Sequence, residues 1–563
     1  MKMTGKKIWK TAGAITLAAV LTLVPVASFA ASSAPPGGSA SGGGADTQTY
    51  DYSGTMSGAL TADGEEVTSD GETTVAETAD QNAALATNGG TLTITNGTLT
   101  KSGDDTNGDN CNFYGINSIA LAVGDGTTMY ISDSSLSADS EGSNGVFSTD
   151  NATAYVYNTS IDTTAGNSRG LDATYSGTII ADSLTIATEG DHSASLATDR
   201  GGGNISVTNS TLSTAGSGSP LLYSTGTIEV SNVTGTASGS QIAGMEGLNT
   251  ILIFNSDLTS TITGATASDP VADGVIIYQS TSGDADTSSG ETALFQAVNS
   301  KLSSSIQSGA MFYITNTTAK VILKDTELNF DSDSAKLLYI AGNDSNNWGT
   351  AGSNGGTVTF AAIGETLDGD ITVDTISSLN LYLQDSTTYT GAITIEENAN
   401  GTSDGSGITV NVDSGSTWVV TGDSTVTNLN VADGGKVVDE SGNTVTITAN
   451  GSTAVEGTSS VTVTVTGSYS TTVDETIEAE AASIDRTDFD SYYGTSTAIA
   501  ETVSDESEND TEATEDTDSA EETTEDTAEE QDGIGTAAII IIIAVAACIV
   551  IVIAVRHNAK KKQ

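Results

Sequence analysis

The scarcest charged side chains outside the two ends of the chain fall close together. Between residues 31 and 555 the sequence contains three arginines and one histidine, and two of these arginines and the histidine lie within 32 residues. Three aspartates are interleaved, so the group comprises Arg169, Asp172, Asp191, His192, Asp199 and Arg200. Carboxyl groups held close together can protonate a leaving group and activate water. The same residues suit structural ion pairs or the binding of a ligand, and the sequence leaves all three interpretations open.

A second candidate site is aromatic. Tyr223, Tyr278 and Tyr313 occupy comparable places in a strand phrase that recurs along the chain. We therefore expect them to stack as a ladder along one face, where a structural role is favoured. If the ladder faces outward, its flat rings would form a platform for sugar rings.

A third candidate is a segment rich in oxygen ligands. It contains Asp104, Asp105, Asn107 and Asp109, spaced like the start of a calcium-binding loop. However, Asn110 stands where such a loop needs glycine, and Ile116 stands where it needs a bidentate glutamate. We therefore expect a turn rich in Asn and Asp and no resident cofactor, with calcium as the alternative.

The elements that must position these residues repeat along the chain. A run of alternating β-branched residues that ends in Asn or Asp recurs roughly every 24 residues, as in Thr178–Asp182, Ile205–Asn209 and Ile228–Asn232. A second strand recurs between these phrases, as in Gly170–Ala173 and Pro220–Tyr223. This period and strand number are typical of one turn of a parallel β-solenoid.

The pattern predicts an all-β fold, a single-chain parallel β-helix. Alternation places one row of side chains inside, and Gly, Asn and Asp take the corners because they tolerate left-handed backbone angles. We expect regular turns over residues 49–356 and a continued β-helix over 357–497, with roughly 19 turns at about 4.8 Å each.

Part of the second section resembles a known family. Ser416, Trp418 and the Val-Thr-Gly-Asp423 phrase precede Leu429 and Gly434-Gly435, as in the later turns of bacterial autotransporter passenger domains. Residues 379–435 carry this resemblance, and the remaining exterior is similar in architecture to adhesin-like right-handed β-helix proteins of bacterial surfaces. The resemblance implies a displayed rod, and this chain departs from it because no outer-membrane barrel segment follows.

β-Helices of this kind also include polysaccharide lyases and hydrolases. Lyases of the fold pair an Arg or Lys base with carboxylates that hold calcium and substrate, so the segment from Arg169 to Arg200 is the place for such a site. Fold alone does not decide function. A structural role remains favoured, because in so acidic a chain an arginine is the natural counter-ion of Asp172 and Asp199.

Both ends of the chain indicate export and anchoring. Residues 1–30 have the basic, apolar and small-residue regions of a signal peptide, and residues 31–48 form a flexible linker. Residues 533–555 are apolar and long enough for a transmembrane helix, and the basic tail 556–563 places that end in the cytoplasm. Residues 498–532, rich in acids, predict a disordered stalk. We therefore expect a single-pass cell-membrane protein with its N-terminal part outside.

The charge balance limits the partners. The chain has 73 acidic residues and 17 Lys and Arg, for a formal charge of −56. Such a surface repels phosphate backbones, which excludes nucleic acid as a partner. Our leading hypothesis is a non-enzymatic surface adhesin that binds a glycan or protein ligand. The alternatives are a surface polysaccharide lyase or hydrolase, and an envelope spacer without a ligand.

Overall fold

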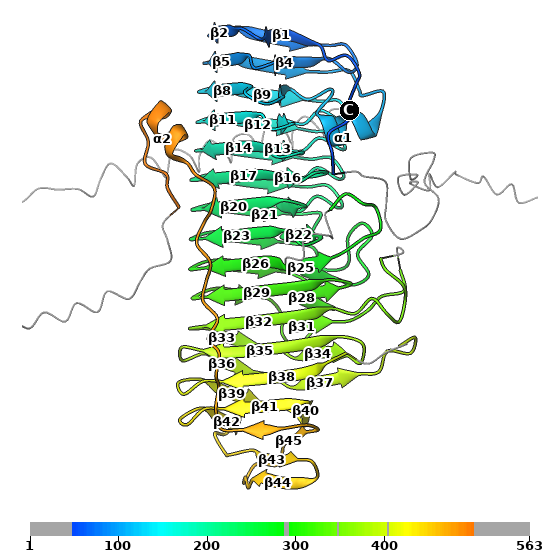
Figure 1. Cartoon of the computed structure of the whole chain (residues 1–563), viewed down its shortest axis with the longest axis vertical. Helices are drawn as coiled ribbons and strands as arrows, with labels where there is room; N and C mark the ends of the chain where they lie inside the picture. The colour runs from blue at the N-terminus through cyan, green and yellow to red at the C-terminus, as the bar shows by residue number, and fades with distance from the viewer. Residues whose placement is uncertain (1–47, 286–291, 346–347, 402–404, 500–563) are drawn as a thin grey trace, which may run out of the picture. The chain divides into compact units, whose positions relative to one another are not determined.

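The computed structural model describes residues 48–285, 292–345, 348–401 and 405–499, which form stacks of parallel β-strands (Figure 1). All of them belong to one compact unit that spans Met1–Val503. Successive turns of the chain contribute neighbouring strands to the same sheets. The predicted parallel β-helix is therefore confirmed for the described residues.

Two long sheets run through the stack. Sheet A has 13 strands: β1 (Gly58–Asp63), β4 (Asn82–Thr87), β7 (Ala120–Val123), β10 (Val146–Thr149), β13 (Leu171–Ala173), β16 (Leu196–Thr198), β19 (Leu222–Ser224), β22 (Ala243–Glu246), β25 (Asp273–Tyr278), β28 (Ala310–Thr315), β31 (Lys336–Ile340), β34 (Ile371–Asp374) and β37 (Ile393–Glu396). Sheet B has 15 strands: β2 (Glu66–Asp70), β5 (Thr91–Thr95), β8 (Thr128–Ser132), β11 (Thr153–Tyr157), β14 (Gly177–Asp182), β17 (Gly203–Thr208), β20 (Thr227–Ser231), β23 (Thr250–Phe254), β26 (Ala293–Val298), β29 (Thr318–Lys324), β32 (Thr357–Ile363), β35 (Ser378–Gln384), β38 (Gly407–Val412), β41 (Asn428–Val431) and β46 (Tyr469–Ser470).

The third side of the stack changes sheet along its length. Sheet C contains β3 (Thr73–Ala76), β6 (Thr98–Lys101), β9 (Ser135–Ala138), β12 (Ser160–Thr163), β15 (Thr185–Thr188), β18 (Thr211–Thr214), β21 (Thr234–Ala237), β24 (Asp257–Ser260), β27 (Lys301–Ser304) and β30 (Glu327–Asn329). Sheet D contains β33 (Thr366–Asp368), β36 (Thr388–Thr390), β39 (Thr417–Val420) and β42 (Lys436–Asp439). Sheet E contains β40 (Ser424–Val426), β43 (Thr446–Ala449), β44 (Ser452–Val455) and β45 (Thr462–Val465), and its β43–β44 pair is antiparallel. Sheet C ends before residue 357, where the second predicted section begins, and sheet D begins after it.

Strand alternation builds the interior. In sheet B, Met129 stands in register with Ala154, and Ile131 with Val156, and all four side chains are fully buried. Like side chains stack in this way from turn to turn, and they form one continuous hydrophobic cluster. The longest sheet has 15 strands, fewer than the roughly 19 turns expected, because loops and the segment after Ser470 use the remaining residues.

The corner after each sheet B strand has a left-handed backbone. Asn158, Asn209, Asn232 and Asn255 have φ between 44° and 57° there, as the Asn/Asp phrase predicts. Their amides also bond between turns, for example Asn232 Nδ2 to Asn209 Oδ1 at 2.5 Å. The prediction of Asp182 as a corner residue was wrong. Strand β14 includes Asp182, and Ser183 takes the left-handed angle.

The same corner is also held by buried side-chain acceptors for backbone N–H groups. Ser210 Oγ accepts from Leu184 N at 2.9 Å, and Ser256 Oγ accepts from Val233 N at 3.0 Å. In a later turn Glu365 takes this place, and its Oε1 accepts from Thr326 N at 2.8 Å. Glu365 is 3% exposed, and burial raises its pKa to about 8.

We predict that Glu365→Gln makes stability less dependent on pH. A carboxyl whose pKa is raised on folding favours the folded state below its unfolded pKa, and this contribution is lost as pH rises through about 8. Glutamine keeps the acceptor and carries no charge, so the variant should match the wild type near pH 5 and melt at higher temperature at pH 9. Thermal unfolding across pH tests this. Glu327→Gln, on an exposed side chain, is the matched control, and parallel profiles for E365Q and wild type would contradict the assignment.

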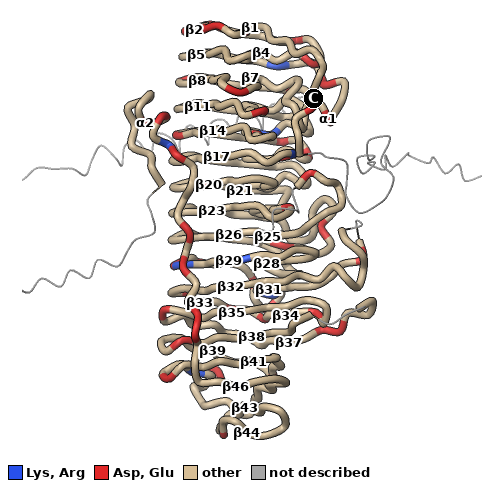
Figure 2. The backbone as a smooth tube through the Cα atoms, in the orientation of Figure 1, with Lys and Arg blue, Asp and Glu red and all other residues tan. Residues whose placement is uncertain are grey.

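After the last strand the chain runs back along the outer face of sheet B. Residues 471–486, which we call the strap, lie across successive strands and lead to helix α2 (Thr487–Tyr493) (Figure 1). Gln384 and Gln296 each hold the strap backbone with both amide atoms, at Ile477 and Glu480 respectively. Figure 2 shows acidic residues along the strap. The β-helix therefore ends at Ser470, earlier than the predicted residue 497.

Sheet A is covered near the N-terminal end of the stack. Helix α1 (Gly108–Tyr114) is inserted between β6 and β7, begins at its cap Asn107 and ends at Gly115, whose φ is 70°. It lies against sheet A, where Cys111 and Phe113 are buried. Tyr50, from the segment before β1, contacts Tyr114 edge-on with ring centroids 5.6 Å apart.

Several predictions fall outside the described residues. These are the signal peptide 1–30, most of the linker 31–48, almost all of the stalk 498–532, the transmembrane helix 533–555 and the tail 556–563. Among the described residues, neither helix has the length and apolar character needed to cross a membrane.

Candidate functional site: a cavity on sheet A

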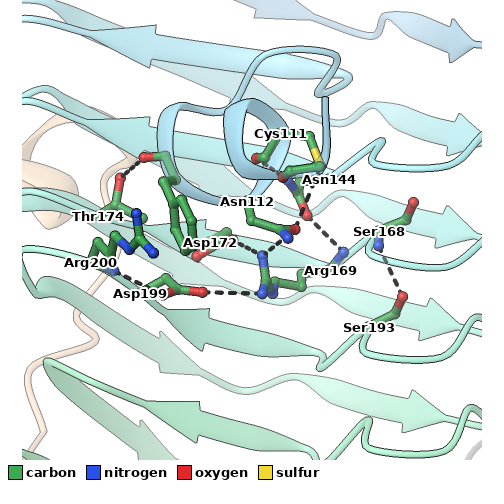
Figure 3. A network of polar contacts seen from close by, with 12 residues as sticks. Cys111, Asn112, Asn144, Ser168, Arg169, Asp172, Thr174, Ser193, Asp199 and Arg200 are labelled. Carbon is green, nitrogen blue, oxygen red and sulfur yellow. Dashed lines mark hydrogen bonds and ion pairs between the residues drawn. The ribbon is translucent and has the colours of Figure 1, made fainter. Parts of the chain in front are cut away.

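Arg169 is placed by the corner that precedes β13. Its backbone N–H donates to Asn144 Oδ1 at 2.9 Å. The residue before it is fixed by a column of serines, in which Ser168 N donates to Ser193 Oγ at 2.9 Å (Figure 3). In the next turn Ser193 N donates to Ser219 Oγ at 2.9 Å. Because each turn repeats this contact, the Arg169 side chain leaves the corner in a fixed direction.

The guanidinium of Arg169 is held by three acceptors. Nη1 lies 3.0 Å from Asp172 Oδ2 and 3.1 Å from Asn112 Oδ1, and Nη2 lies 3.1 Å from Asp199 Oδ2 (Figure 3). Asp172 is on β13, Asp199 directly follows β16, and Asn112 is on α1, so three separate elements meet at one side chain. The structural ion pairs expected at Arg169 are present.

Electrostatics at this cluster favour the charged arginine. Burial opposes the charge of Arg169, but Asp172 and Asp199 outweigh burial and hold its pKa above the ordinary value. Burial raises the pKa of Asp172 to about 7 although Arg169 lowers it, and burial also raises the pKa of Asp199. Oδ1 of Asp172 has no hydrogen-bond partner among the described residues. Two carboxyl groups thus share one guanidinium.

Arg200 lies beside this cluster with other partners. Its Nε is 2.5 Å from Asp284 Oδ1, and its guanidinium stands 3.6 Å from the ring centroid of Phe113. Its backbone N–H donates to Asp199 Oδ1 at 2.9 Å. The expected Arg200–Asp199 ion pair is therefore replaced by this backbone contact and by an ion pair to a distant loop.

A cavity of about 310 Å³ opens beside these residues. Of the predicted ligand-binding residues, the following line it: Arg169, His192, Asp199, Tyr223 and Tyr278. Asp172 and Arg200 lie behind the wall, bonded to Arg169 and Asp284 respectively. The charged cluster and two of the three tyrosines, predicted separately, therefore belong to one site, and Tyr313 does not line it.

The tyrosines form a wall of this cavity without a continuous ladder. Tyr223 shares a register column with Tyr313, but Gly244 and Ile276 stand between them, and Tyr278 lies in register with Glu246 instead. Tyr223 donates its hydroxyl to Glu246 Oε2 at 3.1 Å. The predicted stack of all three rings was therefore wrong.

Tyr278 stacks on a residue that the sequence analysis did not single out. Its ring lies over Trp348 with centroids 4.2 Å apart and planes at 23°. The hydroxyls of Ser280 and Ser282 donate to Glu246, which joins the loop after β25 to the tyrosine wall. This contact fixes Tyr278 at the rim of the cavity.

The cavity also has carboxyl groups that the sequence analysis missed. Asp269 and Asp284 line it from long loops, and no repeat phrase marks either residue. Burial raises the pKa of Asp269 to about 7. The distance along the chain hid these contributions, since Asp284 is 84 residues from its partner Arg200.

The candidate calcium segment has other contacts. Asn107 caps α1 by accepting from the N–H groups of Asp109 and Asn110, and Asp104 Oδ1 accepts from Glu141 N at 3.0 Å. Asp109 lines the cavity, and burial raises the pKa of Asp105. Over the described ranges there is no group of three or more His, Cys, Asp or Glu residues arranged to hold a metal ion.

The fold and the cavity define a parallel β-solenoid with a mixed acidic and aromatic site on one sheet. Comparison with protein-family models and with curated proteins yields no match. The function is therefore argued from the site itself.

Proposed function

We propose that this β-solenoid is a ligand-binding protein and that the cavity on sheet A holds a glycan or part of a protein ligand. The observation that carries this is the convergence of Arg169, Asp199, Tyr223 and Tyr278, from four turns of the chain, on one concave site. Concave sites with aromatic walls and a few fixed polar groups are the usual form of a ligand pocket. A spacer without a ligand would need no such cavity.

The contacts of Arg169 favour binding over lyase chemistry. An arginine that serves as a lyase base must first lose its own proton before it can accept one from the substrate. Arg169 is instead bound by three acceptors, and its pKa is raised. Asp269 supports a second candidate function, hydrolysis of a polysaccharide, because a carboxyl with a pKa of about 7 is suited to general acid catalysis. Release of reducing ends from pectins and other glycans would identify this activity.

We further propose that the protein displays this cavity outside the cell as an adhesin. The support is the sequence of its two ends, with an export signal first and an apolar segment followed by basic residues last. Protease protection of the C-terminal tail in intact cells, with exposure of the solenoid, tests this topology.

Filling the cavity should abolish ligand binding without unfolding the protein. Gly244 lines the cavity, and a Cβ atom added to it would lie no closer than 3.6 Å to any neighbouring atom. Gly244→Leu therefore adds bulk there without a severe clash. We expect the purified full-length variant to lose at least 10-fold in affinity for any ligand found on glycan and peptide arrays. Gly422→Leu is the control, since its nearest contact is also 3.6 Å. Undiminished binding by folded G244L would contradict the proposal.

A further inference from the structure

A carboxyl group that lines the cavity, and a second carboxyl group close to it in the chain, are without partners among the described residues. Asp269 lines the cavity, and its carboxyl group forms no hydrogen bond or ion pair with any of the described residues. Asp273, four residues later, is 1% exposed, and neither of its carboxylate oxygens has a hydrogen-bond partner in the described ranges. Burial, and to a smaller extent the charge of Asp269, raises the pKa of Asp273. Buried carboxylates without donors are costly and call for an explanation.

The two arginines at the site are already committed. Arg169 is bound to Asp172 and Asp199, and Arg200 is bound to Asp284. The remaining acidic groups around the cavity are Asp109, Glu246 and Asp269. Carboxyl groups thus outnumber guanidinium groups at the site, and Asp269 is a lining carboxyl group that no arginine pairs with. An anionic ligand such as a uronate would be repelled there.

The tyrosine wall of the cavity suits a cation as well as a ring. Tyr223 and Tyr278 contribute aromatic rings, and a cation above such a ring is attracted by its negative face. The hydroxyl groups of both tyrosines interact with Glu246, so their rings remain as the surface that a ligand can contact. The cavity volume of about 310 Å³ is at the small end of ligand pockets.

We propose that the cavity binds a small ligand that carries a primary ammonium group, and that this ligand is an amino sugar. The inference rests on the proposed binding function and names its ligand class. An ammonium group supplies three N–H donors and one positive charge to carboxylates that have neither. The sugar ring lies against Tyr223 and Tyr278. A linear amine would cover these two aromatic rings less completely.

The test compares ligands that differ in charge at one atom. Full-length protein is titrated calorimetrically, at one pH and ionic strength, with glucosamine, N-acetylglucosamine, glucose, glucuronate and 1,5-diaminopentane. Glucosamine should bind at least 10-fold more tightly than each of the other four. Asp269→Asn should remove the preference for glucosamine over N-acetylglucosamine, whereas Asp257→Asn, the same change on exposed β24, should preserve it.

The outcomes separate the inference from the proposed function. Equal binding of glucosamine, N-acetylglucosamine and glucose, or a preference for glucuronate, would overturn the ammonium assignment and leave a binding cavity in place. Equal or tighter binding of diaminopentane would overturn the amino sugar as the ligand class. Absence of binding by all five probes would overturn the inference, and array ligands retained by G244L would in addition overturn the proposed function.

Discussion

Replacing Arg169 with alanine is expected to lower the free energy of unfolding by about 3–5 kcal/mol, the usual cost of removing one member of a buried ion pair. The side chain of Arg169 is 10% exposed, and those of Asp172 and Asp199 are 0% and 7% exposed. Its removal leaves two carboxyl groups without their shared cation. Chemical denaturation at pH 8 measures the loss.

The pH dependence of this loss identifies its cause. Burial already raises the pKa of Asp172 to about 7 in the wild type, and removing Arg169 takes away the group that lowers it. Protonation relieves the unpaired charge, so the R169A deficit should shrink as pH falls below 7. Lys301→Ala serves as the control, because the Lys301–Glu327 pair is exposed and should contribute nothing measurable. An R169A deficit no larger than that of K301A would contradict the buried network.

Arg486→Ala is expected to release the strap while the solenoid stays folded. Arg486 is 3% exposed and donates to Ser206 O and Oγ, Ala181 O, Thr208 Oγ1 and Thr497 Oγ1 at 2.8–3.0 Å. No carboxylate within the described residues forms an ion pair with it, so backbone and hydroxyl oxygens hold its charge. Hydrogen bonds to a charged group contribute about 1.5–3 kcal/mol, and the strap should lose about 3 kcal/mol in all.

Hydrogen exchange resolves this local effect. Amides of residues 477–497 should exchange about 100-fold faster in R486A, since 1.4 kcal/mol corresponds to a factor of 10, while those of the inner sheets keep their protection. Lys320→Ala removes an exposed ion pair to Glu480 and should leave strap exchange nearly unchanged. Unchanged exchange in R486A, or loss of protection throughout the solenoid, would each show that Arg486 is not a local anchor.

The geometry of the strap follows from two spacings. From Ile477 to Arg486 the chain advances nine residues, about 30 Å when extended. The sheet B strands it crosses, from β35 to β17, are six turns apart, about 29 Å at 4.8 Å per turn. An extended chain therefore matches the sheet along this length. The last described residues consequently lie against the N-terminal turns, where Tyr492 stacks on Tyr130 with centroids 4.0 Å apart.

Repetition is why the sequence predicts the solenoid. The phrase from Ile205 to Asn209 and its counterpart from Ile228 to Asn232 pair residue for residue in β17 and β20, because identical local patterns stack in register. The corner at Asp182 was misplaced by one residue. Ile179 pairs with Ile205 and Asp182 with Thr208, so Ser183 takes the corner, and the serine carries no stronger signal than its neighbour.

The strap could be inferred only indirectly. Ile180, Leu252 and Ile322 point outward from sheet B, yet each is at most 4% exposed because the strap region covers that face. Continuous apolar runs mark strands that are buried on both faces, so this signal was present in the sequence. The covering segment itself has no repeat and few apolar residues, which is why its place was not predicted.

The candidate site was half predictable. Arg169 and His192 stand out because arginine and histidine are scarce in this chain, and Asp199 lies near both in the sequence. One turn of the repeat brings all three together. Asn112 arrives on a short inserted helix, and Asp269 on a long loop, and neither obeys the period. Long-range contacts of inserted segments depend on packing that no local pattern encodes.

A crystallographic fragment screen tests the central claim most directly. Crystals of the protein are soaked separately with small amines, neutral sugars and uronic acids, and bound fragments are located by their electron density. The cavity on sheet A should hold fragments between the rings of Tyr223 and Tyr278 and the carboxyl of Asp269, and amines should occupy it most often. Fragments found repeatedly on other surfaces, with this cavity empty in every soak, would contradict its assignment as the ligand site.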